Sequence, residues 1–265
     1  MQPTPSPLAP QPHATSLLTA RALQMVYGTD STATRALAGV DVTIAPAESV
    51  AIMGPSGSGK TTLLHCLAGI VKPTSGSVLW RGQDLATLKD TQRTALRRSD
   101  FGFVFQSGQL LPELPAVENA ALPLMLGGMP RAAAVATAAA RLRDLGLAGM
   151  EDRRPGELSG GQAQRVAIAR ALVGSPGVIF ADEPTGALDQ TTGAEVMAVL
   201  TQAAAQSGAA LVVVTHDPTV ARWCSRTVAM RDGLISGEFF APGRQGEAGD
   251  QAGTPSAADQ AGPVR

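Results

Sequence analysis

A glycine-rich stretch, "GPSGSGKTT" at residues 54–62, constrains the fold of this chain more than any other feature. It follows the apolar run 50–52 and precedes residues 60–70, whose apolar positions have helical spacing. The order strand, loop, helix is therefore expected. Glycines allow backbone N–H groups to curl around phosphates, and the helix N-terminus adds a favourable dipole. A flexible Gly/Ser turn is the alternative, but the full spacing G-x-x-x-x-G-K-[ST] seldom arises by chance, so we predict a nucleotide-binding loop.

Two side chains of this loop have specific expected roles. Lys60 should reach the β- and γ-phosphates of a nucleotide, and the hydroxyl of Thr61 should coordinate Mg²⁺. ATP and Mg²⁺ are therefore the expected cofactors. The predicted phosphate-binding residues are Gly54, Pro55, Ser56, Gly57, Ser58, Gly59, Lys60, Thr61 and Thr62.

Two adjacent carboxylates, Asp182 and Glu183, follow the apolar run 178–181. Leaving two charges at the edge of a core costs several kcal/mol unless a cation or a reacting group compensates them. A solvated acidic turn is the alternative for such a pair taken alone. Together with the glycine-rich loop, the pair predicts one carboxylate that holds Mg²⁺, Asp182, and one that accepts a proton from the attacking water, Glu183.

The remaining pattern predicts an α/β fold. Short β-branched runs at 178–181 and 211–215, separated by a helix near 193–205, are typical of a parallel sheet. Residues 17–52 offer paired strands around a turn at Ala45, and residues 85–156 are mainly helical apart from the run 101–105. We therefore predict a P-loop NTPase core with a mostly parallel sheet, an N-terminal antiparallel β subdomain and a helical subdomain inserted at about 85–156.

Composition narrows the functional classes. The net charge is −1 and aromatic residues make up 3%, which disfavours a nucleic-acid partner. No stretch approaches 18 uninterrupted apolar residues, so no membrane span is expected. The Pro-rich residues 1–16 and the tail 241–265 are expected to be disordered around an ordered domain at 17–240, and Cys66 and Cys224 to be buried thiols of a cytoplasmic protein.

The stretch "LSGGQAQRVAIARAL", residues 158–172, narrows the family. Its Ser-Gly-Gly opens a strongly helical segment and offers free N–H groups to an anion. It precedes Asp182 by about 20 residues, and Gln106 before it and Asp189 and His216 after it stand in matching order. From residue 17 to 237 the chain resembles the nucleotide-binding subunit of ATP-binding cassette (ABC) transporters.

The resemblance implies roles for individual residues. It implies adenine stacking by Tyr27, contact of Gln106 with Mg²⁺ and the attacking water, and contact of His216 with the γ-phosphate. It implies that Asp182 holds magnesium, that Glu183 is the catalytic glutamate and that Asp189 joins two subunits. The signature of the family corresponds to Ser159, Gly160, Gly161 and Gln162.

The resemblance also implies partners. Two copies would pair head to tail, and a separate membrane permease would hold the protein on the inner face of the cell membrane. The stretches 101–124 and 181–189, with Gly186 where many importers have serine, are similar to the lipoprotein-releasing and macrolide- or peptide-exporting branch, although Ala163 replaces its usual glutamine. A soluble non-transport cassette ATPase and a regulatory ATP sensor are the alternatives.

A leucine cluster follows Gln106. Leu110, Leu111 and Leu114 lie close together among prolines, and we expect them to contribute to the surface that receives the permease. The alternative is that they pack inside the helical subdomain.

Overall fold

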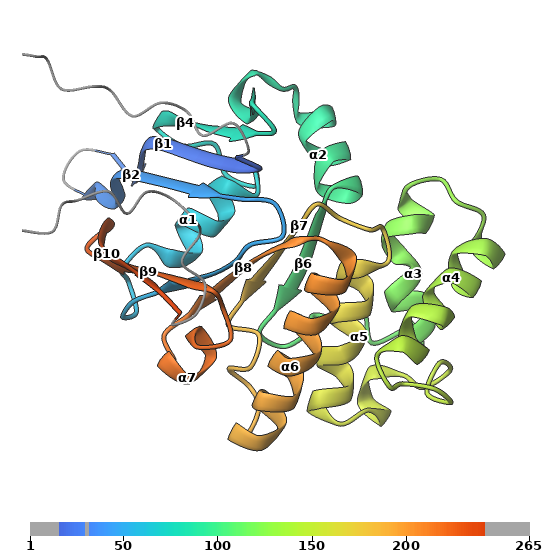
Figure 1. The fold of residues 1–265 in the computed structure, drawn as a ribbon. Coiled ribbons are helices and arrows are strands. Elements are labelled where there is room, and N and C mark those ends of the chain that lie inside the picture. Colours follow the sequence, from blue (N-terminus) through green and yellow to red (C-terminus); the bar gives the residue numbers. More distant parts are fainter. Residues whose placement is uncertain (1–15, 30–31, 242–265) are drawn as a thin grey trace, which may run out of the picture.

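The computed structural model describes residues 16–29 and 32–241 (Figure 1). The expectations for the two chain ends fall almost entirely outside these residues. Within the described ranges the chain forms two β-sheets and a group of helices. None of the described helices is long and apolar enough to cross a membrane.

The larger sheet has six strands in the order β10-β9-β3-β8-β7-β6. All neighbours from β9 to β6 are parallel, and only β10 is antiparallel to β9. The continuous apolar runs of this sheet are buried on both faces, as parallel strands covered by helices require. In sheet order the strands are Leu234–Phe240, Arg226–Arg231, Ser49–Met53, Ala210–Thr215, Val178–Asp182 and Phe101–Phe105.

The smaller sheet is antiparallel and has the order β2-β1-β4-β5. Its strands are β2 (Thr34–Ile44), β1 (Leu18–Tyr27), β4 (Ser75–Trp80) and β5 (Gln83–Asp84). With a mostly parallel core, an antiparallel β subdomain and a helical part, the fold class predicted from the sequence is confirmed. Strands β4 and β5 were not foreseen.

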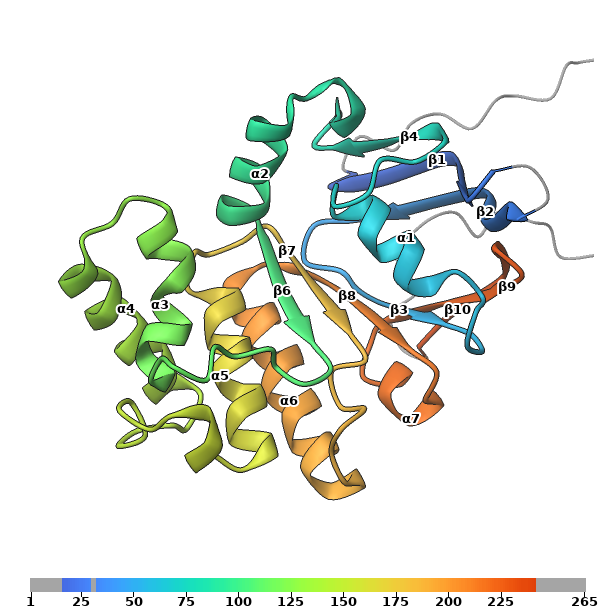
Figure 2. The ribbon, with the colours of Figure 1, turned by 180° about the vertical axis from the view of Figure 1, so that it is seen from behind.

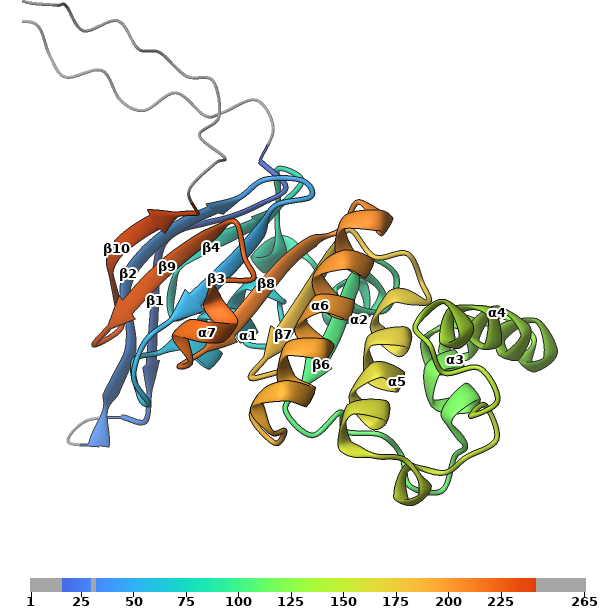
Figure 3. The same cartoon turned by 60° about the horizontal axis from the view of Figure 1, so that its bottom comes forward.

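The helices lie on both faces of the larger sheet. Helix α1 (Lys60–Leu67) packs between the two sheets (Figure 2), whereas α5 (Gly160–Leu172) and α6 (Gln190–Ser207) cover the opposite face (Figure 3). Helices α3 (Ala116–Leu126) and α4 (Arg131–Asp144) pack beyond α5, α2 (Asp90–Ser99) packs on β6, and α7 (Pro218–Ala221) follows β8. Two short 3₁₀ helices span Leu85–Thr87 and Pro155–Glu157.

The larger sheet separates two apolar cores. Along β7, Ile179 and Ala181 point into the core shared with α3, α4, α5 and α6, while Val178 and Phe180 point into the core shared with α1 and the antiparallel sheet. This alternation follows from the two-residue period of a strand. Edge-to-face contacts of Phe101 with both Trp80 and Phe180 join the two sheets inside the second core.

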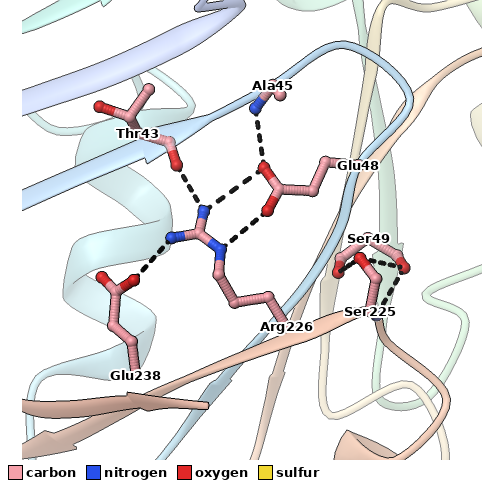
Figure 4. Close-up of polar contacts among 7 residues, drawn as sticks. All are labelled: Thr43, Ala45, Glu48, Ser49, Ser225, Arg226 and Glu238. Atoms are coloured by element: carbon pink, nitrogen blue, oxygen red, sulfur yellow. Dashed lines mark hydrogen bonds and ion pairs between the residues drawn. The ribbon is translucent and has the colours of Figure 1, made fainter. Parts of the chain in front are cut away.

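A buried arginine ties the antiparallel sheet to the edge of the larger one (Figure 4). Arg226 on β9 donates from Nε to Glu48 Oε1 at 2.8 Å and from Nη1 to Glu238 Oε2 at 2.9 Å. It also donates to the backbone carbonyl of Thr43 at the end of β2. One guanidinium therefore links the β2–β3 connection with β9 and β10.

Candidate nucleotide-binding site

The carboxyl ends of four parallel strands meet at one edge of the larger sheet. Met53 of β3 pairs with Thr215 of β8, Asp182 of β7 pairs with Val214 of β8, and Phe105 of β6 pairs with Asp182. The residues that directly follow these strand ends are consequently brought to the same edge. They are Gly54, Gln106, Glu183 and His216.

The glycine-rich loop fills the space between β3 and α1, in the predicted strand–loop–helix order. A Cβ atom on Gly54 would lie 2.3 Å from the carbonyl oxygen of Met230, and one on Gly59 would lie 2.3 Å from that of Ala36. Gly57 and Gly59 have φ angles of 80° and 97°, which side chains strongly disfavour. The loop is therefore held against β9 and β2 in a shape that only glycine permits at these positions.

Lys60 curls back over the loop from the first position of α1. Its Nζ donates to the carbonyl oxygens of Gly54 at 2.8 Å and Pro55 at 2.9 Å, and the residue is only 8% exposed. Because an ammonium group has three donors, one remains for an anion in the loop. A phosphate chain therefore fits this cradle of glycines, helix N-terminus and lysine.

The central part of the loop is braced by the β9–β10 turn. The N–H of Gly233 donates to the carbonyl oxygen of Ser58 at 3.1 Å, and the carbonyl of Gly233 accepts from the N–H of Ala38 at 2.9 Å. The buried hydroxyl of Ser58 has no hydrogen-bond partner in the described part of the chain. Pro55, Ser56 and Thr62 occupy their predicted places in the loop and the first turn of α1.

Asp182 stands beside the first turn of α1. Its Oδ1 accepts a hydrogen bond from the Thr61 hydroxyl at 3.3 Å. Burial raises the pKa of Asp182, and the hydrogen bond from Thr61 acts in the opposite direction. A cation at this point would relieve the cost of burying the carboxylate, and oxygen ligands of this kind suit Mg²⁺. Thr61 and Asp182 therefore fit a magnesium site.

Glu183 adopts a strained backbone, with φ 46°. Such a left-handed conformation costs a non-glycine residue about 1 kcal/mol or more. A hydrogen bond from its N–H to the carbonyl of Val214, at 2.9 Å, holds it in place. The strain turns the side chain toward the end of β8, where Oε1 lies 2.8 Å from Nδ1 of His216 and 3.1 Å from its backbone N.

Two further residues hold the Glu183–His216 pair. The hydroxyl of Thr215 donates to Glu183 Oε2 at 3.3 Å and accepts from the N–H of Asp217 at 3.0 Å. The side chain of His216 is 65% exposed and that of Glu183 is 22% exposed. A carboxylate and an imidazole, both partly accessible, are thus held together at this edge of the sheet.

The signature segment forms the N-terminus of α5. Ser159 caps the helix: its hydroxyl accepts from the N–H of Gln162 at 3.2 Å, and Gln162 Oε1 accepts from the N–H of Ser159 at 2.9 Å. A Cβ on Gly160 would lie 2.9 Å from Leu188, and one on Gly161 would lie 2.6 Å from Thr192. The signature therefore rests closely on the start of α6.

Asp189 caps α6. Its carboxylate accepts from the N–H groups of Thr191 and Thr192, both at 3.0 Å, and from the Thr192 hydroxyl at 2.6 Å. The Thr192 hydroxyl is the main cause that lowers the pKa of Asp189. Asp189 thus orders the turn against which the signature packs.

The structure does not bring all predicted site residues together. Tyr27 ends β1 in the antiparallel sheet and is 43% exposed. The phosphate loop leads into α1 on one face of the larger sheet, whereas the signature leads into α5 on the other (Figure 3). Within one chain, the phosphate loop and the signature are therefore kept apart.

Comparison with known proteins identifies the family. The model of the family described as ABC transporter matches residues 37–186, more than half of the chain. The chain belongs to the ABC transporter family.

Two curated ABC proteins illustrate the likeness. The lipoprotein-releasing system ATP-binding protein LolD of Geobacter metallireducens is 45% identical over 220 residues, which cover 83% of this chain and 98% of that protein. The macrolide export ATP-binding/permease protein MacB of Chromobacterium violaceum is 48% identical over 209 residues, which cover 79% of this chain and 32% of that protein.

A solved ABC structure agrees with the fold. The bacterial cassette MJ0796, in a dimeric post-hydrolysis state bound to ADP and Pi, has a TM-score of 0.78 and is 39% identical. The match covers 86% of this chain and 100% of that one.

Two residues of the candidate site, Thr215 and Gly233, were not predicted from the sequence. Thr215 could have been found, because it lies directly between a predicted strand and His216. For Gly233 the sequence indicates only a turn, through the pair Asp232-Gly233. Its hydrogen bond to the carbonyl of Ser58 joins residues that are 175 positions apart in the chain. Such a contact depends on the pairing of β9 with β3, which the local pattern does not encode.

The leucine cluster after Gln106 divides between two environments. Leu110 packs against the helical core, Leu114 is half-buried and Leu111 is 45% exposed. The fully buried Asn119 shapes this loop: it accepts from the N–H of Leu111 at 2.8 Å and donates to the carbonyls of Leu111 and Leu114 at 3.0 and 2.9 Å.

Proposed function

We propose that this chain is the ATP-hydrolysing subunit of an ABC transporter that energises a separate membrane permease for export or lipoprotein release. One observation carries the proposal: four parallel strand ends gather a phosphate-binding loop, a buried carboxylate, a second carboxylate and a histidine at one edge. The names of LolD and MacB support the transport role and the branch.

In this proposal each residue has one task. Lys60 and the loop amides bind the phosphate chain, and Tyr27 stacks on the adenine. Thr61, Gln106 and Asp182 hold Mg²⁺, which offsets the charge that develops on the transferred phosphate. Glu183 accepts the proton of the attacking water. His216, whose Nδ1 lies 2.8 Å from Glu183 Oε1, orients that carboxylate and the γ-phosphate.

A second copy of the chain completes the site. Because α1 and α5 lie on opposite faces of the sheet, Ser159, Gly160, Gly161 and Gln162 are offered to the nucleotide of the partner. Asp189 lies next to this signature and takes part in the contact between the two copies. A head-to-tail dimer then contains two complete sites, in keeping with the dimeric state of the related cassette.

A groove of about 590 Å³ is suited to the permease. It lies between α2, α3, α5 and β6, and Phe105 and Gln109, on either side of Gln106, both line it. Its lining is mainly apolar, and its charged residues are Arg97, Arg98 and Arg170. A permease segment bound there would hold the protein at the cytoplasmic face of the membrane. The relatives give no support to a soluble non-transport ATPase or a regulatory ATP sensor.

Two substitutions test the function. Glu183→Gln keeps the shape of the site but removes the base, so it should bind ATP while hydrolysis falls by about 10²- to 10⁴-fold. Lys60→Ala should abolish binding, because it removes the charge that faces the phosphates. Equilibrium binding of a fluorescent ATP analogue and phosphate release measure the two effects.

Matched controls come from exposed residues of the same types. Glu195→Gln on α6 and Lys72→Ala after α1 should leave binding and hydrolysis unchanged. Hydrolysis at the wild-type rate by Glu183→Gln, or wild-type affinity in a folded Lys60→Ala protein, would refute the assignment.

A further inference from the structure

The hairpin of β9 and β10 contacts the glycine-rich loop at two points. In the turn of this hairpin, the N–H of Gly233 donates to the carbonyl oxygen of Ser58 at 3.1 Å. At the start of the loop, a Cβ atom on Gly54 would lie 2.3 Å from the carbonyl oxygen of Met230 on β9. The carbonyl of Gly233 accepts from the N–H of Ala38 on β2 at 2.9 Å. The turn is therefore fixed to β2 on one side and supports the loop on the other.

Two observations restrict position 233 to glycine. Its φ angle is 76°, a left-handed conformation that side chains disfavour. A Cβ atom at this position would also lie 2.9 Å from the carbonyl oxygen of Ala36. Because that oxygen belongs to the backbone of β2, it cannot move aside as the end of a flexible side chain would. A larger residue therefore displaces the turn and misaligns the N–H that Gly233 donates to Ser58.

The hydrogen bond from Gly233 orients one peptide group of the loop. A trans peptide group is planar, and its C=O and N–H point in opposite directions. Since the carbonyl of Ser58 faces the β9–β10 turn, the N–H of Gly59 points away from that turn. Within residues 16–29 and 32–241 this N–H has no acceptor. It directly precedes Lys60, whose Nζ lies over the loop, and it can therefore donate to a phosphate.

We propose that Gly233 is a positioning residue for ATP: by fixing the Ser58–Gly59 peptide group, it keeps the N–H of Gly59 directed at the phosphate chain. This inference rests on the proposed function, in which the loop binds the phosphates. The loop is then shaped before ATP arrives, which lowers the cost of binding. Hydrolysis at saturating ATP depends less on Gly233, because Asp182 and Glu183 stand at the end of another strand, β7.

The other hairpin of the chain provides a matched control. The β4–β5 turn consists of Arg81 and Gly82, with φ angles of 48° and 83°, and the β9–β10 turn consists of Asp232 and Gly233, with φ angles of 51° and 76°. A Cβ atom on Gly82 would meet nothing within 4 Å. Gly82→Ala therefore introduces the same kind of backbone strain as Gly233→Ala, without the contact at Ala36.

Equilibrium binding of a fluorescent ATP analogue tests the proposal. Gly233→Ala should raise the Kd by about 10-fold, the scale of one misdirected hydrogen bond to a charged acceptor, and should change kcat at saturating ATP by less than about 2-fold. Gly82→Ala should lower Tm by about 2–4 °C and leave the Kd unchanged. Gly233→Asn is a second variant in case Gly233→Ala does not fold, because asparagine tolerates a left-handed φ but still carries a Cβ atom. It should raise the Kd as Gly233→Ala does.

Three results would overturn the proposal. The first is a wild-type Kd in a folded Gly233 variant, and the second is an equal rise in Kd from Gly82→Ala. The third is a rise in Kd that disappears in the Tyr27→Ala background, since the turn would then act on the adenine through β2, whereas independent effects multiply. Failure of wild-type protein to bind ATP would contradict the proposed function itself. Equal ATP binding by wild-type protein and Gly233→Ala would contradict only the role of Gly233.

Discussion

Removing the guanidinium of Arg226 should destabilise the protein measurably. Its side chain is 9% exposed, and its partners Glu48 and Glu238 have side chains that are 19% and 35% exposed. In Arg226→Met the stem still packs, but both carboxylates lose their cation. Glu48 keeps only the N–H of Ala45, at 2.8 Å, among its present donors.

The magnitude follows from the burial of each partner. Stranding a buried charge costs about 3–5 kcal/mol, and the partial exposure of Glu48 reduces this to about 2 kcal/mol. The more exposed Glu238 adds about 0.5 kcal/mol, and the lost bond to the Thr43 carbonyl adds about 0.5–1 kcal/mol. The free energy of unfolding should therefore fall by about 3 kcal/mol, which lowers Tm by about 6–12 °C in a chain of this size.

Thermal unfolding followed by circular dichroism measures this change. Arg222→Met is the matched control, because Arg222 is exposed at the end of α7 and should tolerate the change within about 0.5 kcal/mol. The double variant Glu48→Gln with Arg226→Met should recover part of the loss, since the stranded charge is gone. If Arg226→Met lowered Tm by less than about 3 °C, the reasoning that this cation compensates buried carboxylates would be refuted.

Two further predictions concern binding. Tyr27→Ala should weaken ATP binding by about 1 kcal/mol, which raises the Kd about 5-fold, the scale of one lost base–aromatic stack. An unchanged Kd in a titration with a fluorescent ATP analogue would show that adenine stacks elsewhere. Leu111→Ser should reduce permease capture in a pull-down without changing Tm, whereas Leu110→Ser should lower Tm, because Leu110 packs on the helical core and Leu111 is 45% exposed. Equal effects of the two serine variants on Tm would contradict this division.

The sequence predicted those parts of the fold that depend on local pattern. The apolar runs 178–181 and 211–215 and the run before the loop 54–62 are local patterns that predict strands. The structure has β7 and β8 at the first two runs and β3 directly before the loop. The parallel register of these strands then places the residues that follow them at one edge. The catalytic candidates Glu183 and His216 were therefore within reach of sequence reasoning.

The pairing of strands that are far apart in the chain could not be predicted from the sequence. The runs that form β4 and β5 are short, and they become strands because β4 pairs with the edge of β1 and β5 then pairs with β4. The hydrogen bond from the N–H of Gly233 to the carbonyl of Ser58 requires that β9 lies beside β3. The neighbouring residues Leu110 and Leu111 differ in burial in a loop whose backbone at Leu111 is held by Asn119, eight positions along the chain.

The placement of the phosphate loop and the signature on opposite faces of one sheet has a genetic consequence. In the head-to-tail homodimer that we propose, a lesion at Lys60 and a lesion at Gly161 would each inactivate both sites. In a mixed dimer, however, one site would contain both lesions and the other would combine two intact halves. Two inactive alleles expressed together would thus complement each other, up to half of the activity per mixed dimer. Two lesions in the same half, such as Lys60 with Thr61, would stay inactive together.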